Sequence, residues 1–383
     1  MQSQHIAVTI RQSVQTYAAL PAMRYKQNNQ WQTISYQTMG ERGNTVARAL
    51  LALGVQPGDR IGIFAENRPE WALADFGILS VGGVCVPIYA TNTKLQAAYI
   101  VEETAMTILF TGGQEHYDKI QAVIERMPCL QTIVSFDEEV VLQGEHSLHF
   151  SQFLQLGADP TANAEIDGRL AAASVEDLAT IIYTSGTTGE PKGVMLTHAN
   201  LYHQFTAMDG QFTVGPHDRS LCFLPLTHVY ERTWSYFVFK CGAVNYYLTN
   251  PKAVIETMQE VRPTVMVSVP RLYEKVYAAA YAGLEQGSDV KRRLFHWAIG
   301  VGSAYQYGRK ENRPIGPWLK WQHRLADRLV LCKIRDVVGG PKNFFSAGGA
   351  PLARSIEEFF FAAGLLVCEG YGLTETSPMI TFN

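Results

Sequence analysis

A loop of small and hydroxylated residues separates two apolar segments near the middle of this 383-residue chain. It runs from position 184 to 193 and contains three glycines and one lysine, and the apolar residues at 179–183 and 194–197 predict a strand on either side. Unobstructed backbone N–H groups, hydroxyl donors and a single cation together suit a polyphosphate. The spacing therefore predicts a nucleotide phosphate loop, with these candidate residues: Thr184, Ser185, Gly186, Thr187, Thr188, Gly189 and Lys192.

The loop differs from the common phosphate loops. A Walker A loop ends in Gly-Lys-Ser/Thr and runs into a helix. Here Lys192 is followed by Gly193, which offers no hydroxyl for magnesium, and strand-forming residues come next. The pattern of protein-kinase glycine loops does not match either, so another nucleotide chemistry is indicated.

The ten residues at 184–193, ending in Pro-Lys-Gly, resemble the signature loop of the adenylate-forming superfamily of acyl-CoA synthetases, luciferases and peptide-synthetase adenylation domains. Two further superfamily motifs follow in the expected order, Ser-Ala-Gly-Gly-Ala-Pro-Leu at 346–352 and Tyr-Gly-Leu-Thr-Glu-Thr at 371–376. The resemblance implies that Thr374 contacts a phosphate of ATP and that Glu375 ligates Mg²⁺, a hard cation that carboxylates suit. It also implies a set of residues at or near the adenine, with the tyrosine stacked beside it: Gly348, Gly349, Ala350, Pro351, Tyr371 and Gly372.

A histidine motif points to the acid substrate. The segment at 225–232, Pro-Leu-Thr-His-Val-Tyr-Glu-Arg, is similar to a string typical of long-chain acyl-CoA synthetases. The resemblance implies that His228 lies near the fatty carboxylate and the α-phosphate, where an imidazole can orient a carboxylate by hydrogen bonding or by charge. Trp234 and the aromatics after it either line an acyl tunnel or form ordinary core. Glu231 and Arg232 either act in the site or form a structural ion pair on a helix.

The implied reaction is the ATP-dependent activation of a long-chain fatty acid, first to an acyl-adenylate and then to the coenzyme A thioester. His228, Lys192, Thr374 and Glu375 are the expected catalytic residues, and ATP, Mg²⁺ and coenzyme A are the expected cofactors and co-substrates. Positioning and charge stabilisation would supply the catalysis. Two alternatives stay open: a ligase that loads a carrier protein, and a non-catalytic module that binds a nucleotide or a lipid.

Alternating strand-like and helix-like segments predict an α/β fold, and the length predicts two to three domains. The resemblance implies the large N-terminal part of the adenylate-forming fold, layered α/β/α/β/α, with interleaved subdomains at about 1–175 and 176–383. The barrel and the C-terminal lid of the family are expected to be missing, so the chain alone should turn over poorly. The polar segment at 144–174 predicts an irregular connection.

Composition limits the partners. The net charge of −3 argues against bulk binding of nucleic acid, and six scattered cysteines with no visible signal peptide favour a cytoplasmic protein. Residues 291–335 hold eleven Lys/Arg against two acids, with interleaved aromatics. A solvated helical insert with inward-packed aromatics is the favoured interpretation, and peripheral contact with the inner face of a membrane stays open.

Overall fold

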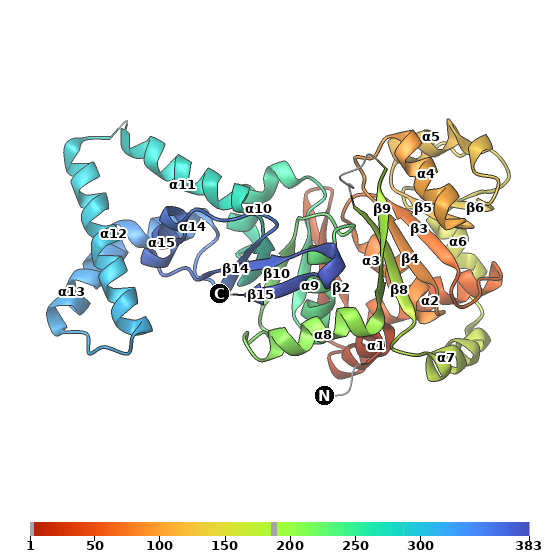
Figure 1. Cartoon of the computed structure of the whole chain (residues 1–383), viewed down its shortest axis with the longest axis horizontal. Helices are drawn as coiled ribbons and strands as arrows, with labels where there is room; N and C mark the ends of the chain where they lie inside the picture. Colours follow the sequence, from red (N-terminus) through yellow and green to blue (C-terminus); the bar gives the residue numbers. More distant parts are fainter. Residues whose placement is uncertain (1–3, 185–189, 286, 383) are drawn as a thin grey trace. The chain divides into compact units, whose positions relative to one another are not determined.

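The computed structural model describes residues 4–184, 190–285 and 287–382 (Figure 1). These residues form two compact units. Unit 1 comprises the chain up to His217 together with Cys222–Thr249 and Thr374–Pro378, and unit 2 comprises Asp218–Leu221, Asn250–Leu373 and the residues from Met379 on. The expected subdomain division between 175 and 176 does not coincide with the bounds of these two units, and it stays a prediction.

A seven-stranded sheet with the order β7-β6-β5-β3-β4-β8-β9 forms the centre of unit 1. All neighbouring strands are parallel except β8 and β9, which form an antiparallel hairpin. This arrangement confirms the α/β class and the two strands expected around the glycine-rich loop. The strands are β3 (Arg60–Phe64), β4 (Val84–Ile88), β5 (Ile108–Thr111), β6 (Thr132–Ser135), β7 (Ser147–His149), β8 (Leu178–Thr184) and β9 (Lys192–Thr197).

Alternating side chains of these strands fill two layers. Phe64, Val86 and Leu109 pack in one buried cluster with residues of α4 (Lys94–Thr104) and α5 (Gln114–Gln121). Phe110 contacts Phe153 of α6 (Phe150–Leu156) with ring centroids 5.2 Å apart. Because β4 is buried along its whole length, it reads as a continuous apolar run, as a central parallel strand should.

The segment at 144–174 is not irregular, and that prediction was wrong. It contains β7, α6 and α7 (Asn163–Ala172). Few apolar residues occur here, but those of the helices recur at helical spacing and are buried, namely Phe150 and Phe153 in α6 and Ile166 and Leu170 in α7. Two short helices that each bury one narrow stripe look polar overall, which explains why composition misled the prediction.

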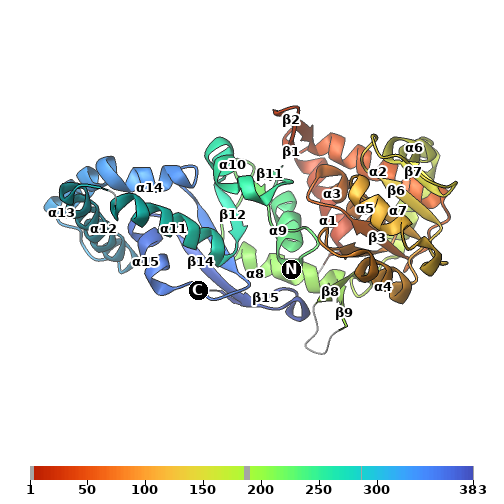
Figure 2. The same cartoon turned by 90° about the horizontal axis from the view of Figure 1, so that it is seen from above.

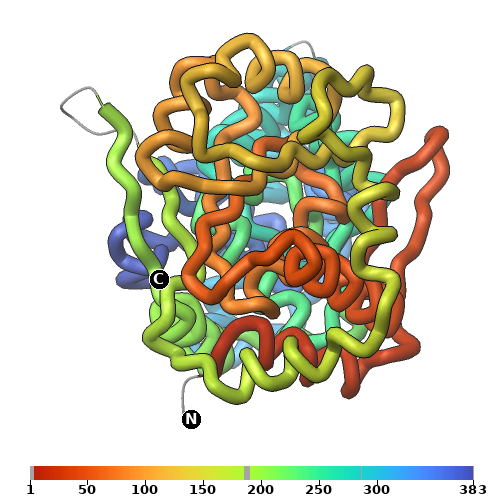
Figure 3. The backbone as a smooth tube through the Cα atoms, turned by 90° about the vertical axis from the view of Figure 1, so that its right-hand side faces the viewer, coloured from red at the N-terminus to blue at the C-terminus, as the bar shows by residue number. Residues whose placement is uncertain are grey.

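The remaining elements of unit 1 include a small group of strands in which β1 pairs antiparallel with β2 and parallel with β11. Figure 3 shows the N-terminal segment in red beside the yellow-green α7, where Arg11 and Asp167 form an ion pair of 2.7 Å. These elements are α1 (Ile6–Thr16), β1 (Pro21–Gln27), β2 (Gln30–Ser35), α2 (Tyr36–Ala52), α3 (Pro69–Ser80), α8 (His198–Asp209), α9 (Val229–Lys240), β11 (Val244–Tyr247) and the short 3-10 turns η1 (Ile124–Arg126), η2 (Pro160–Ala162) and η5 (Thr374–Thr376).

Unit 2 has a sheet with the order β10-β12-β13-β14-β15, parallel except for the last pair. Tyr273 of α11 anchors a helix to this sheet, because its hydroxyl donates to the carbonyl of Ser346 at 2.9 Å and its ring packs on Phe345. The elements are β10 (Arg219–Cys222), η3 (Pro251–Ala253), α10 (Val254–Val261), β12 (Val265–Ser268), α11 (Pro270–Glu285), α12 (Asp289–Lys310), α13 (Pro317–Ala326), the π-helical turn η4 (Asp327–Leu331), α14 (Cys332–Val337), β13 (Phe344–Gly348), α15 (Arg354–Ala362), β14 (Val367–Gly372) and β15 (Met379–Phe382). Within the described ranges, none of the helices has the length and apolar character needed to cross a membrane.

Candidate active site

The glycine-rich loop joins β8 to β9. Thr184 and Lys192 are cross-strand partners at the loop end of this hairpin, with Lys192 exposed and Thr184 half-buried. Ser185, Gly186, Thr187, Thr188 and Gly189 lie outside the described residues, so their predicted contacts with phosphate stay predictions. The hairpin thus presents the predicted hydroxyl and cation at the two ends of the loop.

Gly193 completes the Pro-Lys-Gly signature for a structural reason. A Cβ atom at this position would lie 2.8 Å from the Cγ2 atom of Ile181 and 3.2 Å from the ring of Tyr183 on the facing strand. Such distances are too short for ordinary van der Waals contact, so the close approach of the strands requires glycine here.

Thr374 and Glu375 belong to unit 1 through the turn η5, which lies against β9. Thr374 is buried, whereas Glu375 is exposed. The structure therefore gathers the lysine of the loop and the predicted phosphate and magnesium residues on two neighbouring elements. These lie 182 positions or more apart in the sequence.

His228 caps the N-terminus of α9. Its Nδ1 accepts a hydrogen bond of 3.2 Å from the backbone N–H of Tyr230. The imidazole is exposed, but surrounding protein atoms desolvate it and lower the pKa of His228 below the usual 6.5. A neutral ring that accepts at Nδ1 carries its proton on Nε2, so His228 offers a hydrogen-bond donor to a carboxylate or phosphate oxygen.

Asn67 and Glu231 hold the segment that leads to His228. The side-chain amide of Asn67 donates to the carbonyl of Leu224 at 2.7 Å, and its oxygen accepts from the N–H of Leu226 at 2.9 Å. Oε2 of Glu231 accepts from the N–H of Leu224 at 3.2 Å. These bonds fix the backbone on both sides of Pro225. No local pattern in the sequence marks Asn67 for this role, because its partners lie more than 150 positions away.

Glu231 does not pair with Arg232, so the alternative of an ion pair between them on α9 was wrong. Glu231 is fully buried, and burial raises the pKa of its carboxyl well above the ordinary value. Within the described part of the chain its Oε1 has no hydrogen-bond partner. Burial thus favours the neutral form of this carboxyl over its carboxylate.

The structural ion pair of Arg232 is with Asp75 of α3. The guanidinium donates to both carboxylate oxygens, through Nε at 3.2 Å and through Nη2. Burial alone would lower the pKa of Arg232, but the nearby Asp75 raises it well above the ordinary value. Asp75 is the sole acid within the apolar run 71–79. Because acids are rarely buried without a partner, this isolated acid could have predicted a buried ion pair from the sequence.

Arg232 also connects the histidine to the phosphate loop. Its Nη1 donates to the hydroxyl of Thr180 on β8 at 2.7 Å, and that hydroxyl donates to the carbonyl of Cys85 at 2.7 Å. Tyr236 completes the buried group, because its hydroxyl accepts from Nε of Arg232 at 2.8 Å and donates to Asp75. One buried guanidinium therefore links α9, which begins after His228, to the strand that enters the loop at Thr184.

Trp234 lies in the same helix and is buried beside Phe237, with ring centroids 5.7 Å apart. Tyr236, Phe237 and Phe239 are buried as well. These residues form core packing around α9, and an acyl-tunnel role for Trp234 stays a prediction.

The residues expected at the adenine lie together in unit 2. Gly348 ends β13 opposite Gly370 of β14, and the backbone N–H of Leu352 donates to Glu369 at 3.1 Å, which joins the two segments. Gly349 has a left-handed φ of +83° and open space where a Cβ atom would stand. The four residues Gly349, Ala350, Pro351 and Tyr371 are exposed, so they offer backbone and one aromatic ring to a flat ligand.

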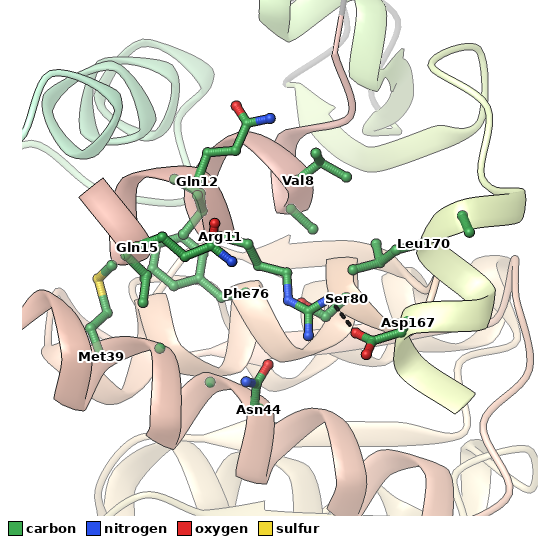
Figure 4. Close-up of a pocket in the computed structure, with 16 residues that line it drawn as sticks. Val8, Arg11, Gln12, Gln15, Met39, Asn44, Phe76, Ser80, Asp167 and Leu170 are labelled. Atoms are coloured by element: carbon green, nitrogen blue, oxygen red, sulfur yellow. Dashed lines mark hydrogen bonds and ion pairs between the residues drawn. The ribbon is translucent and has the colours of Figure 1, made fainter. Parts of the chain in front are cut away.

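Unit 1 contains a cavity of about 620 Å³. Figure 4 shows its lining residues, with the Arg11–Asp167 ion pair at one side. Its walls come from α1, α2, α3 and α7, and none of the sequence-predicted site residues lines it. The cavity is therefore separate from the candidate active site.

A layered α/β chain that presents this hairpin, an N-capping histidine and a Thr-Glu turn has the fold and the motifs of adenylate-forming enzymes. The chain belongs to the family of AMP-binding enzymes, whose model matches residues 10–383.

Similar proteins agree with this assignment. The chain is 35% identical to the long-chain-fatty-acid–CoA ligase FadD15 of Mycobacterium bovis, over 91% of this chain and 56% of the relative. It is 29% identical to the long-chain-fatty-acid–CoA ligase ACSBG2 of Rattus norvegicus, over 96% of this chain and 56% of the relative. The chain thus spans about half the length of these curated relatives.

Solved structures confirm the expected fold. The N-terminal domain of FACL13 from Mycobacterium tuberculosis matches with a TM-score of 0.68 and 20% identity, over 99% of this chain and 78% of that one. The anthranilate CoA ligase AuaEII matches with a TM-score of 0.72 and 18% identity, over 100% of this chain and 62% of that one. At these identities the likeness concerns the fold alone.

Proposed function

We propose that the protein containing this chain activates a long-chain fatty acid with ATP and transfers the acyl group to coenzyme A. The observation that carries the proposal is the N-capping His228, which offers Nε2–H from the histidine motif in a chain whose curated relatives are named long-chain-fatty-acid–CoA ligases. Because the chain spans 56% of those relatives, the activity is proposed for the whole protein, and the chain by itself is expected to be a poor catalyst.

In the first step a carboxylate oxygen of the fatty acid attacks the α-phosphorus of ATP. A new P–O bond forms, the bond to the bridging oxygen of the β-phosphate breaks, and pyrophosphate leaves with that electron pair. In the second step the thiolate of coenzyme A attacks the acyl carbonyl and AMP leaves. The enzyme's task is to hold the reactants in line and to balance their charge.

Unit 1 supplies the groups proposed to act on the phosphates and the carboxylate. Lys192, Thr184 and the loop between them would bind the β- and γ-phosphates, and Thr374 would donate to a phosphate. His228 would donate from Nε2 to the carboxylate as it approaches, which orients the anion without adding a formal charge. The buried bonds of Asn67 and Arg232 support this proposal because they hold the backbone that carries the imidazole.

Glu375 is the proposed protein ligand of Mg²⁺. Its exposed carboxylate on η5 fits this role, since Mg²⁺ usually keeps several waters and binds through one or two carboxylates plus substrate phosphates. The ion would supply charge neutralisation for the tetra-anionic ATP. In unit 2, Gly348, Gly349, Ala350 and Pro351 would border the adenine together with Tyr371 and Gly372.

A ligase that loads a carrier protein is the second candidate. It uses the same adenylation step, and the fold of this chain also matches the A-PCP didomain of a carboxylic acid reductase with a TM-score of 0.70 at 20% identity.

A cytoplasmic location with peripheral contact to a membrane through residues 291–335 completes the proposal.

The test is an ATP–pyrophosphate exchange assay on the whole protein across a fatty-acid series from C4 to C18, followed by acyl transfer to coenzyme A or to an acyl carrier protein. We expect exchange that is strongest with long chains and transfer to coenzyme A. Exchange with transfer to the carrier alone would establish the second candidate, and a lack of exchange with every acid would leave the chain as a binding module.

A further inference from the structure

A row of apolar side chains is exposed along α13 and the turn η4 in unit 2. Trp318, Trp321, Leu325 and Leu329 are 67%, 54%, 37% and 39% exposed. Trp318, Trp321 and Leu325 follow at intervals of three and four residues, which places them on one face of α13, and Leu329 comes next in η4. We name these four side chains the Trp318 face. The two indole rings stack with centroids 5.0 Å apart and an interplanar angle of 15°.

The other side of α13 is already used for packing. His323 stacks on Tyr305 of α12 with ring centroids 3.8 Å apart, and Ala326 is fully buried. Both Figure 1 and Figure 2 show α13 lying alongside α12. The aromatic side chains of this region were expected to pack inward. Trp318 and Trp321 do not, because α13 packs against α12 through its other face.

A row of positive charge runs beside the Trp318 face. Lys320 and Arg324, four residues apart, share one side of α13, and Arg328 follows in η4. All three are exposed, and within the described ranges none of them forms an ion pair with an acid. The acid of the same segment, Asp327, is already paired with Arg335 at 2.7 Å.

We propose that the Trp318 face docks on an anionic membrane surface. Tryptophan is enriched at the boundary between lipid and water, leucine side chains can enter the acyl region, and neighbouring lysine and arginine bind anionic headgroups. The alternative partner is a second copy of this chain, whose net charge is only −3. The charge pattern favours the membrane, because an anionic membrane presents many closely spaced headgroups to the three neighbouring cations. The purpose of docking rests on the proposed function, since a long-chain fatty acid partitions into membranes, but docking itself can be measured without catalysis.

The experiment is flotation of the whole protein with large unilamellar vesicles of phosphatidylcholine alone or with 30 mol% phosphatidylglycerol, a composition chosen at about the charge density of an anionic leaflet. We expect binding to the anionic vesicles that weakens as NaCl increases, and little binding to the neutral ones. Two variants test the face: Trp318→Ser/Trp321→Ser and Lys320→Gln/Arg324→Gln/Arg328→Gln. Each should lower the apparent vesicle affinity by about tenfold or more, since interfacial tryptophans and each basic residue near the surface contribute to such binding.

The matched control is Leu95→Ser/Val141→Ser, which removes two apolar side chains of unit 1 with exposures of 53% and 70%. This control should bind vesicles like the parent protein. Equal binding of the parent and both face variants, or no binding to anionic vesicles at all, would overturn the proposal. A dimer that the tryptophan variant abolishes, in the absence of vesicle binding, would overturn it as well and assign the face to a second copy.

Exchange activity with a short, water-soluble fatty acid separates this proposal from the proposed function. We expect both face variants to retain that activity at the parent level. If the parent protein lacks exchange activity but binds anionic vesicles through the Trp318 face, the docking inference stands and the ligase assignment fails.

Discussion

Nη1 of Arg232 donates a hydrogen bond of 2.7 Å to the hydroxyl of Thr180 in the interior of unit 1. Arg232 lies four residues after His228, and Thr180 lies four residues before Thr184. The bond therefore joins the helix that presents the proposed carboxylate-binding histidine to the strand that enters the proposed phosphate loop. We infer that this pair sets the geometry between the groups proposed to hold the two reactants of adenylation, the fatty carboxylate and ATP.

Replacing Thr180 by Val should impair adenylation while the fold is retained. Valine keeps the shape of threonine but leaves one donor of Arg232 buried without its partner, which costs about 1–3 kcal/mol of the free energy of unfolding. We expect the exchange kcat to fall more than the KM for ATP rises, because the loss concerns alignment rather than binding. Urea unfolding and exchange kinetics measure the two effects. Thr180→Ser keeps the hydroxyl and should restore kcat, so an equal loss in both variants would contradict the positioning role.

Breaking the Arg232–Asp75 pair should be more costly. Asp75→Asn leaves a buried cation without its counter-charge, and removing one partner of such a pair typically costs about 3–5 kcal/mol of unfolding free energy. The double variant Asp75→Leu/Arg232→Met removes both charges. Its loss of unfolding free energy should be smaller than the sum of the losses in the single variants Asp75→Leu and Arg232→Met. A double-mutant cycle by chemical denaturation provides the measurement, and additive losses would show that the two side chains do not interact.

His228 should act as a neutral donor. Its Nδ1 accepts from Tyr230 and its pKa lies below 6.5, so the form with Nε2–H predominates at pH 7. We expect His228→Ala to lower the exchange kcat by roughly 100-fold, and His228→Gln, which retains a donor near the Nε2 position, to lose less. The activity of the parent should fall as the pH drops through the lowered pKa, since protonation removes the acceptor at Nδ1. This acidic limb should be absent in His228→Gln, and its persistence there would assign the limb to another group.

Glu375 and Lys192 should differ in what their replacement changes. Glu375→Gln removes the charge of the proposed magnesium ligand and should raise the Mg²⁺ concentration that gives half-maximal exchange by about tenfold. Lys192→Ala removes the cation proposed to bind the phosphates and should raise the KM for ATP with little effect on the Mg²⁺ requirement. Exchange kinetics titrated with each component measures both. Unchanged kinetics in the two variants would count against both assignments.

Acid should weaken the docking of α1 through His5 and His198. These rings stack with centroids 3.4 Å apart, and burial lowers the pKa of His5 to about 4 and that of His198 to about 2. Because the unfolded chain takes up protons near pH 6.5 and the folded chain does not, stability is complete above pH 6.5 and declines as the pH falls towards 4. His5 alone accounts for a loss of about 3 kcal/mol over that range.

The variant His5→Asn tests this contribution. An asparagine oxygen can still accept from the N–H of Ala7, as Nδ1 of His5 does at 3.3 Å, so the cap of α1 is retained. We expect urea midpoints measured between pH 7 and 5 to change less in this variant than in the parent protein. An identical slope would place the acid sensitivity elsewhere.

The sequence by itself determined the chemistry that is local in the chain. The strand–loop–strand pattern around 184–193 predicted the two strands β8 and β9, and it follows from short-range periodicity and from the residue types that a loop requires. His228 was singled out by the resemblance of its eight-residue motif to that of long-chain acyl-CoA synthetases. The helices at 144–174 were not predicted, because each is short and buries too few apolar residues to show a helical period in the sequence.

The tertiary structure decided which distant residues support these motifs. Asp75, Thr180 and Asn67 contact the histidine segment or its helix across more than 50 positions of sequence, and no local pattern encodes such pairs. It also decided which aromatic side chains of the basic region pack inward, because α13 turns one face towards α12 and leaves Trp318 and Trp321 exposed. The physical reason is the same in each case. Burial and charge pairing depend on which surfaces meet in the fold, whereas the sequence shows only which residues are available to meet.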